Sequence, residues 1–241
     1  MNPKDLFVQN LFDRIAHRYD LLNRVISFRI DSVWRKKAVG ELRLAGEHKL
    51  ILDLGTGTGD LAFAAANVMG DKGRVVGLDF SAEMLRLAME KTPRRRLGGK
   101  IAYVRASALQ PPFKGGTFDG VMTAFVLRNI SDLDLFFRQA YGLLKPGGRM
   151  VALDMFPPRG GTFSFLYSLY FYRLVPWIGA ALAGDRNAYR YLSNSVKGFD
   201  PPESIAQTIR RAGFPEVRLR KFLRGAICLH VGDKPDSAES I

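Results

Sequence analysis

The residues with the clearest chemical potential form a glycine-rich run between two carboxylates, Asp53 and Asp60. The apolar stretch before the run predicts a buried strand, and the residues after it predict a helix. Glycine adopts positive φ and has no side chain, so a strand–turn–helix of this kind lets a ligand approach the backbone closely. We expect Asp53 and the glycines Gly55, Gly57 and Gly59 to contact that ligand.

Another carboxylate, Asp79, lies twenty residues after Gly59 at the end of a second apolar stretch, residues 75–78. An acid at this place in a nucleotide-binding α/β fold hydrogen-bonds the ribose hydroxyls. The alternative is a purely local role, because Ser81 looks like the N-cap of the next helix. With the loop upstream, Asp79 predicts a site for a nucleoside-containing cofactor.

The residues around the loop narrow the choice of cofactor. Its spacing is Gly-x-Gly-x-Gly, which differs from the Gly-x-Gly-x-x-Gly of dinucleotide folds, but alone it leaves a dehydrogenase open. Carboxylates at Asp53 and Asp60 would repel a pyrophosphate and suit a cationic ligand that carries an amino acid. No second mononucleotide half follows Asp154. With the Lys-Pro-Gly-Gly turn at Lys145, this arrangement resembles the class I S-adenosylmethionine methyltransferases.

The alternation of strands and helices predicts an α/β, Rossmann-like fold: a mostly parallel sheet with helices on both faces. The C-terminal strands, 217–222 and 227–231, are expected to form an antiparallel hairpin. No linker divides the chain, so we expect a single methyltransferase domain, 1–241. Its expected parts are an N-terminal helical substrate cap (1–46), a cofactor-binding core (47–156), an apolar insertion (157–200), a C-terminal helix and hairpin (201–233) and a tail (234–241).

Several motifs carry a narrower resemblance. They are Tyr19-Asp20-Leu21-Leu22-Asn23, Ser27, Trp34, Phe125-Val126-Leu127-Arg128-Asn129, Leu144-Lys145-Pro146-Gly147-Gly148 and Tyr189-Arg190-Tyr191-Leu192. In this order they resemble the ubiquinone/menaquinone biosynthesis C-methyltransferases, and the likeness extends from about Leu11 to Gly232. The N-terminal motif and the Leu-Arg-Asn segment are the most specific, since methyltransferases in general carry neither.

The resemblance implies cofactor contacts at Thr58, Asp79, Ser107, Ala108 and Ala124. The family usually has Asn at the position of Ser107 and Ser at that of Ala124, so these two contacts are expected to differ. It also usually has His where Asp31 stands, Met where Leu22 stands, and Glu-x-Ser where this chain has Asp154-Met155-Phe156. These departures concern the acceptor more than the cofactor.

The resemblance places the catalytic residues at Arg128, Asn129 and Tyr19. A guanidinium stays protonated, so Arg128 is expected to stabilise a developing quinol oxyanion and to orient a water, while Asn129 fixes the ring and Tyr19 contacts a ring oxygen. The alternative for Arg128 is a structural ion pair with Asp132 or Asp134. For Asp20 and Asn23 of the Tyr19 motif, helix capping is an equally good interpretation.

The acceptor implied is a polyprenylated hydroquinone, with 2-demethylmenaquinol ahead of the ubiquinone-pathway benzoquinol. An RNA-binding methyltransferase and an inactive scaffold of a quinone-synthesis complex are the alternatives from other classes. The formal charge of +13 fits RNA or an anionic membrane, but the basic run 91–96 has no interleaved aromatic residues, so no nucleic-acid partner is expected.

The remaining composition points to the cell interior. The N-terminus has no secretory pattern, Cys228 is the single cysteine, and the three histidines lack ligand spacing, so no metal is expected. We expect a cytoplasmic protein, peripheral on the inner face of the cell membrane, with a homodimer left open. The apolar stretch 163–183 is too interrupted to span a bilayer and predicts either a buried helix pair or a lining for a greasy substrate.

Overall fold

A seven-stranded sheet organises the described part of the chain, which is residues 3–44, 48–158, 160–178 and 186–236 of a computed structural model. The strand order is β3-β2-β1-β4-β5-β7-β6. The strands are β1 (Leu50–Leu54), β2 (Arg74–Asp79), β3 (Ile101–Arg105), β4 (Phe118–Ala124), β5 (Leu144–Met155), β6 (Val217–Phe222) and β7 (Ile227–Asp233). Neighbouring strands are parallel except that β7 is antiparallel to β5 and β6. The predicted sheet and terminal hairpin are confirmed.

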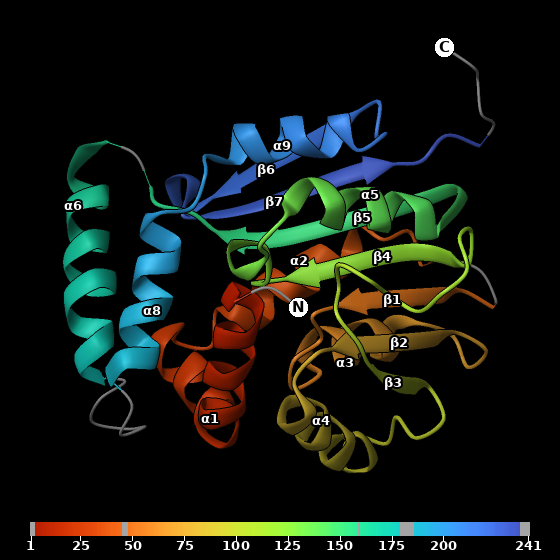
Figure 1. The fold of residues 1–241 in the computed structure, drawn as a ribbon, viewed down its shortest axis with the longest axis horizontal. Helices are drawn as coiled ribbons and strands as arrows, with labels where there is room; N and C mark the ends of the chain where they lie inside the picture. The colour runs from red at the N-terminus through yellow and green to blue at the C-terminus, as the bar shows by residue number, and fades with distance from the viewer. Residues whose placement is uncertain (1–2, 45–47, 159, 179–185, 237–241) are drawn as a thin grey trace.

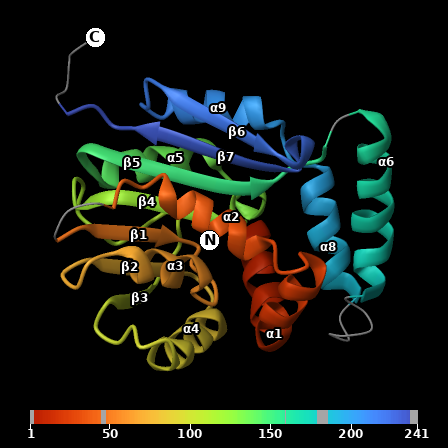
Figure 2. The same ribbon diagram turned by 180° about the vertical axis from the view of Figure 1, so that it is seen from behind.

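Helices cover both faces of the sheet, as predicted. Two of them, α5 (Leu133–Leu143) and α9 (Pro202–Arg211), lie in front of it in Figure 1, and α2 (Asp31–Gly40) and α3 (Asp60–Val68) lie in front in the reverse view of Figure 2. Another helix, α4 (Ala82–Arg94), packs beside β2 and β3.

The alternating residues of β1 explain why both faces are covered. Leu52 and Leu54 are buried with Phe137 in the core beneath α5 and α9, and Ile51 is buried with Phe63 in the core beneath α2 and α3. Successive side chains of a strand point to opposite faces, so a strand apolar on both faces needs a helix layer on each side.

A third group of helices lies beyond the carboxyl ends of the parallel strands (Figures 1 and 2). It consists of α1 (Pro3–Ile26), α6 (Gly161–Leu169) with its π-helical continuation η2 (Tyr170–Leu174), and α8 (Arg186–Lys197). Leu11, Ile15 and Leu22 of α1 form a buried cluster against Tyr191 and Leu192 of α8. This group therefore covers the edge of the sheet where open α/β folds bind ligands.

The insertion is more exposed than one interpretation of the sequence expected. No residue of α6 is buried, and Phe165 has 68% of its surface exposed. The buried helix pair is therefore wrong for α6, because only one side of the helix meets the rest of the fold. Within the described residues, no helix is both long and apolar enough to span a membrane.

One helix is longer than the sequence indicates. Pro93 favours an end of the Ser81 helix at about Met89, but α4 continues to Arg94. A proline in the last turn removes only one hydrogen bond near the helix end, so the cost there is small. The predicted cap is confirmed, because Ser81 Oγ accepts a hydrogen bond from Met84 N at 3.1 Å.

Candidate active site

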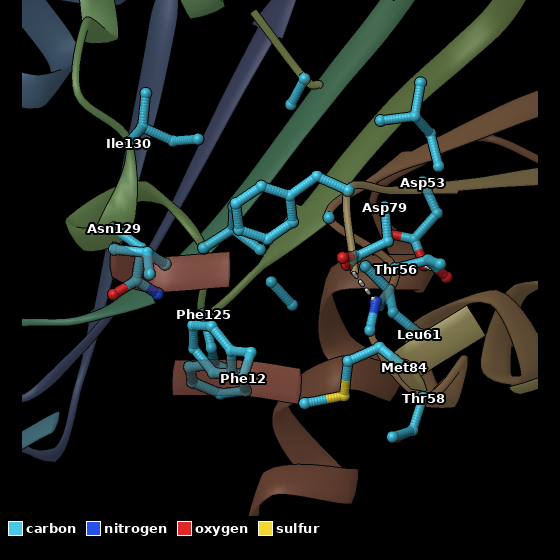
Figure 3. A pocket seen from close by; sticks show the side chains of 18 of the residues that line it. Phe12, Asp53, Thr56, Thr58, Leu61, Asp79, Met84, Phe125, Asn129 and Ile130 are labelled. Carbon is cyan, nitrogen blue, oxygen red and sulfur yellow. Dashed lines mark hydrogen bonds between the residues drawn. The ribbon is translucent and has the colours of Figure 1, made fainter. Parts of the chain in front are cut away.

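A cavity of about 930 Å³, including its open mouth, lies at the carboxyl ends of β1, β2 and β4. In Figure 3, Asp53, Thr56 and Asp79 lie on one side of it, Asn129 and Ile130 lie on the other, and the rings of Phe12 and Phe125 lie together below, nearer to Asn129. The predicted residues that line it are Tyr19, Asp53, Gly55, Gly57, Thr58, Asp79, Ser107, Ala108, Ala124 and Asn129. Gly59 and Arg128 are the predicted residues that do not.

The glycine loop is built as its sequence predicts. Gly55, Gly57 and Gly59 have φ of +75°, +55° and +89°, values that favour glycine. A side chain at Gly55 would also collide with Val126, whose Cγ2 would be 2.6 Å from the added Cβ. Gly59 does not reach the cavity; it starts α3, and a Cβ there would be 2.9 Å from the Phe63 ring.

Asp79 organises the loop from the neighbouring strand. Its Oδ2 accepts a hydrogen bond from Gly57 N at 2.8 Å and its Oδ1 accepts one from Ser81 N at 2.9 Å. Burial raises the pKa of Asp79 to about 6, although these backbone hydrogen bonds act to lower it. The local role considered from the sequence is therefore present, and the same carboxylate also lines the cavity.

Asp53 presents a free carboxylate oxygen. Its Oδ2 accepts a hydrogen bond from Thr56 Oγ1 at 2.7 Å, whereas its Oδ1 is buried without a partner among the described residues. Burial raises the pKa of Asp53 to about 7, the Thr56 hydrogen bond and the charge of Arg35 lower it, and the charge of Asp79 raises it. A buried acceptor without a donor is costly, so this oxygen is ready for a cationic or N–H-bearing ligand.

Arg35 of α2 is a residue of the cavity that the sequence reasoning missed. Its guanidinium lies 5.0 Å from the centre of the Phe125 ring and forms an ion pair with Asp31 one helical turn earlier. Ser27 Oγ donates to the other Asp31 oxygen at 2.7 Å. Asp31, where the family usually has His, therefore orients a positive charge at the cavity wall, and the i, i+4 spacing of this acid and base was the available signal.

Phe125 is held in an unusual backbone conformation. Its φ is +63°, a region that a bulky residue rarely adopts, and Phe125 N donates to Leu153 O at 2.8 Å. Such a conformation costs about 1–3 kcal/mol and concentrates at functional sites. The strained turn directs the Phe125 ring into the cavity (Figure 3).

Helix α1 is attached to the glycine loop by the Tyr19 motif. Thr58 Oγ1 donates to Asp20 Oδ1 at 2.6 Å, and Lys91 Nζ contacts Asp20 Oδ2 at 2.7 Å and Asp60 Oδ1 at 3.3 Å. Helix capping is therefore not the role of Asp20. It joins α1, the loop and α4 in one network, and the Thr58 hydroxyl predicted for the cofactor is already used by this network.

Further polar contacts hold α1 along its length. Gln9 Nε2 donates to Phe80 O at 3.2 Å, and Ser81 Oγ donates to Asp13 at 2.5 Å. The Tyr19 ring lines the cavity; burial raises the pKa of its hydroxyl, whereas a hydrogen bond with Asn23 lowers it. Together these contacts make α1 a cover over the cofactor side of the cavity.

Arg128 has a different ion-pair partner from those considered from the sequence. It lies in the short 3-10 helix η1 (Leu127–Asn129) after β4, and its Nη1 donates to Asp154 Oδ1 at 2.5 Å. Asp132 instead caps α5, and Asp134 pairs with Arg211. The expected local pair is wrong because the end of β5 lies beside β4 in the sheet and brings Asp154 to Arg128.

Asn129 faces the cavity on the side away from the carboxylates (Figure 3). Its Oδ1 accepts a hydrogen bond from Tyr191 Oη at 3.3 Å, so α8 fixes its orientation. The remaining walls, to which the sequence reasoning gave no role in the site, are mostly apolar: Val8, Phe12, Leu61, Leu78, Phe80, Met84, Leu109, Phe125, Val126 and Ile130. The cavity thus joins an acidic end, suited to a cation, to an apolar end that carries an amide and a phenol.

No group of three or more His, Cys, Asp or Glu side chains suited to a metal ion occurs in the described ranges. Cys228 is buried, as expected for a core residue.

Curated relatives match nearly the whole chain. A demethylmenaquinone methyltransferase of Thermus thermophilus is 43% identical over 93% of this chain and 100% of its own length. The ubiquinone/menaquinone biosynthesis C-methyltransferase UbiE of Pasteurella multocida is 35% identical over 97% of this chain and 87% of its own.

Solved structures share the fold at low sequence identity. A SAM-dependent methyltransferase of Aquifex aeolicus is 20% identical, with a TM-score of 0.58 over 88% of this chain and 92% of that chain. A SAM-dependent methyltransferase of Thermotoga maritima is 19% identical, with a TM-score of 0.62 over 94% and 99%. The model of the ubiE/COQ5 methyltransferase family matches residues 1–234. With the relatives above, this match shows that the chain is a methyltransferase and belongs to the ubiE/COQ5 family.

Proposed function

We propose that this methyltransferase transfers a methyl group from S-adenosylmethionine to a ring carbon of a polyprenylated hydroquinone, 2-demethylmenaquinol in preference to the ubiquinone-pathway benzoquinol. The observation that carries the proposal is a single cavity with Asp53 and Asp79 at one end and Tyr19, Asn129 and an apolar wall at the other. The names of the relatives, demethylmenaquinone methyltransferase foremost, support the choice of acceptor.

The residues present fit the cofactor. The unpartnered Oδ1 of Asp53 suits the ammonium of its methionine part, and the charge of Arg35, which acts on Asp53, suits the carboxylate. Asp79 at the end of β2 suits the ribose, and Ser107 and Ala108 suit the adenine edge. When bound, S-adenosylmethionine supplies an electrophilic methyl group on a sulfonium.

The acceptor side supplies orientation and charge stabilisation. The Asn129 amide, fixed by Tyr191, and the Tyr19 hydroxyl hold the ring so that its reactive carbon faces the cofactor end of the cavity. The positive charge of Arg128 acts on Tyr19 and stabilises the oxygen that becomes negative as the carbon attacks. Arg128 itself keeps its proton, so the quinol proton leaves through water.

The apolar walls favour an aromatic acceptor over a polar one. Phe12, Phe125 and Ile130 line the cavity on the side of Asn129 (Figure 3). Closing such a site on a ring excludes water, which strengthens the few polar contacts that remain.

We further propose that the protein docks on an anionic membrane surface to reach this substrate. Phe28 is 72% exposed and Trp177 is 63% exposed, and the Phe28 ring stacks on Tyr170 of η2 at 5.9 Å. Phe28 and Arg29 both have positive φ, at +50° and +61°, so the turn holds an aromatic residue outward at an energetic cost. Arginine side chains beside this surface complement anionic headgroups; they include Arg24, Arg29 and Arg173.

A strain that lacks the gene tests the proposed reaction. Lipid extracts should accumulate demethylmenaquinone, and the gene on a plasmid should restore the methylated quinone. Accumulation of the demethylated benzoquinone precursor would move the assignment to the ubiquinone pathway. Unchanged quinones would contradict the proposal.

A second experiment tests the role of Arg128. Arg128→Ala should lower turnover about 100-fold or more, the scale of losing an oxyanion donor. S-adenosylmethionine affinity, measured by calorimetry, should change little. Normal cofactor binding also shows that the variant is folded. Turnover at the wild-type level with normal cofactor binding would mean that Arg128 is not catalytic.

A further inference from the structure

A second cavity adjoins the cofactor cavity, and Arg35 and Asp60 line both of them. It measures about 800 Å³, including its open mouth. Its walls come from the ends of α1 and α4 and from α2 and α3, which face the viewer in Figure 2 with α1 and α4 below them. A concave surface lined by one sign of charge concentrates the electrostatic potential and attracts the opposite charge. The cationic side chains that line this basic cavity are Arg24, Arg29, Arg35, Lys36 and Arg95.

The acidic residues of the basic cavity, Asp31 and Asp60, already have cationic partners. Asp31 pairs with Arg35, and its other oxygen accepts a hydrogen bond from Ser27 Oγ at 2.7 Å. Asp60 Oδ1 lies 3.3 Å from Lys91 Nζ. Positive charge therefore exceeds negative charge around the cavity. The cations left without an acidic partner within the described ranges are Arg24, Arg29, Lys36 and Arg95.

A strained turn between α1 and α2 brings two of these arginines to the cavity. Arg29 N donates to Arg24 O at 2.9 Å, and Ser32 Oγ donates to Arg29 O at 2.8 Å. Arg29 has a φ of +61°, which is uncommon for a residue with a side chain. The turn thus gathers two guanidinium groups at one cavity at an energetic cost, and such costs concentrate at functional sites.

An aromatic ring supports Arg95. The Arg95 guanidinium lies 5.2 Å from the centre of the ring of Phe63, which is buried and lines the cavity. Contact over a ring uses the face of a guanidinium and leaves the N–H groups at its edge for hydrogen bonds. No acceptor for the Arg95 side chain occurs in the part of the chain that the structure describes. Its N–H groups are therefore available to a ligand.

We propose that the basic cavity binds a phosphate group, carried by a lipid headgroup or free in solution. Guanidinium groups donate paired hydrogen bonds to phosphate oxygens, and a lysine ammonium adds a point charge. A single carboxylate would leave most of the four uncompensated cations unused, whereas a phosphate offers more acceptor oxygens. The exposed Phe28 directly precedes Arg29 in the same turn, so the proposed membrane docking would supply a lipid phosphate. Only that source rests on the proposed function.

Two pairs of adjacent residues allow a charge-matched test. Lys36→Gln/Arg95→Gln removes two cations that line the cavity, and Lys37→Gln/Arg94→Gln removes two cations next to them that do not. Inorganic phosphate is titrated at constant ionic strength and followed by phosphorus-31 NMR, and circular dichroism checks that both variants fold. Lys36→Gln/Arg95→Gln should bind phosphate about tenfold or more weakly than wild type, the scale of losing hydrogen bonds between charged groups. Lys37→Gln/Arg94→Gln should stay within about twofold of wild type, because it removes only long-range attraction that salt screens.

Flotation with phosphatidylglycerol vesicles identifies the source of the phosphate. If Lys36→Gln/Arg95→Gln weakens vesicle binding clearly more than Lys37→Gln/Arg94→Gln does, the ligand is a lipid headgroup. If only the binding of inorganic phosphate depends on Lys36 and Arg95, the ligand is a free phosphate, and the site stands even where the proposed docking fails. Equal losses in the two double variants in both assays, or no binding of either probe by wild type, overturn the site.

Discussion

The guanidinium of Arg128 and the carboxylate of Asp154 form a buried ion pair, in which the side chains are 3% and 0% exposed. Arg128 lies in η1 just after β4, Asp154 lies at the end of the adjacent strand β5, and the second Asp154 oxygen has no partner among the described residues. The pair fixes the guanidinium at the edge of the acceptor side. Asp154 is therefore a positioning residue for Arg128.

Asp154→Asn should destabilise the protein by about 3 kcal/mol, because it leaves a buried guanidinium without its counter-ion. Urea denaturation followed by circular dichroism measures this. The control is Asp154→Glu, which keeps the charge and is the residue type usual in the family; it should lose clearly less stability. Equal losses in the two variants would mean that geometry at this position matters and charge does not.

The bond between Asp20 and Thr58 should contribute to cofactor binding by keeping α1 over the cavity. Asp20→Asn replaces a charged acceptor that both Thr58 and Lys91 use, so S-adenosylmethionine affinity should fall about 5-fold to 30-fold. Calorimetry measures the affinity. Glu83→Gln is the control, since it weakens only exposed contacts, one with His17 on α1 and one with Arg86 within α4, and should have almost no effect.

Cofactor affinity should rise with pH because Asp53 binds an ammonium only when ionised. Its pKa is raised to about 7 in the free protein, so affinity should increase from pH 5.5 to pH 7 and level off above that. Asp53→Asn should bind more weakly and lose most of this pH dependence. A wild-type affinity that stays flat over this range would contradict the role of Asp53.

The same carboxylates set how stability depends on pH in the free protein. Because the folded pKa values of Asp53 and Asp79, about 7 and about 6, exceed the ordinary 3.8, the native state holds more protons than the unfolded state between these values. Their stabilising protonation is complete below pH 3.8 and lost as pH rises through 6 and 7. The free energy of unfolding of the wild type minus that of Asp53→Asn should therefore fall as pH rises from 4 to 7. Urea titrations of both proteins at each pH will measure this difference.

Docking on membranes should depend on the exposed aromatic surface. Phe28→Ser and Trp177→Ser should each weaken binding to phosphatidylglycerol vesicles about tenfold. Each substitution removes apolar surface whose transfer into the membrane contributes about 1.5 kcal/mol or more to the binding free energy. Vesicle flotation measures the binding. Met89→Ser, at an exposed methionine on α4, is the control and should bind as wild type does. Equal weakening in all three variants would place the contact elsewhere.

The sequence predicts the cofactor side of the site better than the acceptor side. The glycine loop and Asp79 depend on local chemistry, positive φ and a strand end, which a short stretch of residues encodes. The contacts of Asp20 with Thr58 and of Arg128 with Asp154 join residues 38 and 26 positions apart. No local pattern encodes such pairs, because the packing of α1 and the pairing of β4 with β5 bring them together.

The environments of Arg35 and Tyr167 also depend on tertiary packing and cannot be predicted from the neighbouring sequence. Arg35 looks like one of many surface bases until α2 packs against the sheet and turns it to the cavity. Tyr167 belongs to an aromatic stretch that could equally be a buried pair or a lining. Only the structure shows that the Tyr167 hydroxyl has no partner among the described residues, whereas the Tyr170 hydroxyl donates to Ile26 O.

The most direct test of the account is turnover by the purified protein. Reduced demethylmenaquinone and S-adenosylmethionine bearing a deuterated methyl group are mixed with the enzyme, and the product is analysed by mass spectrometry. The account predicts one labelled methyl group on the ring carbon next to a hydroxyl, with slower turnover of the benzoquinol. Label on oxygen, or no label transfer by a protein that binds the cofactor normally, would contradict it.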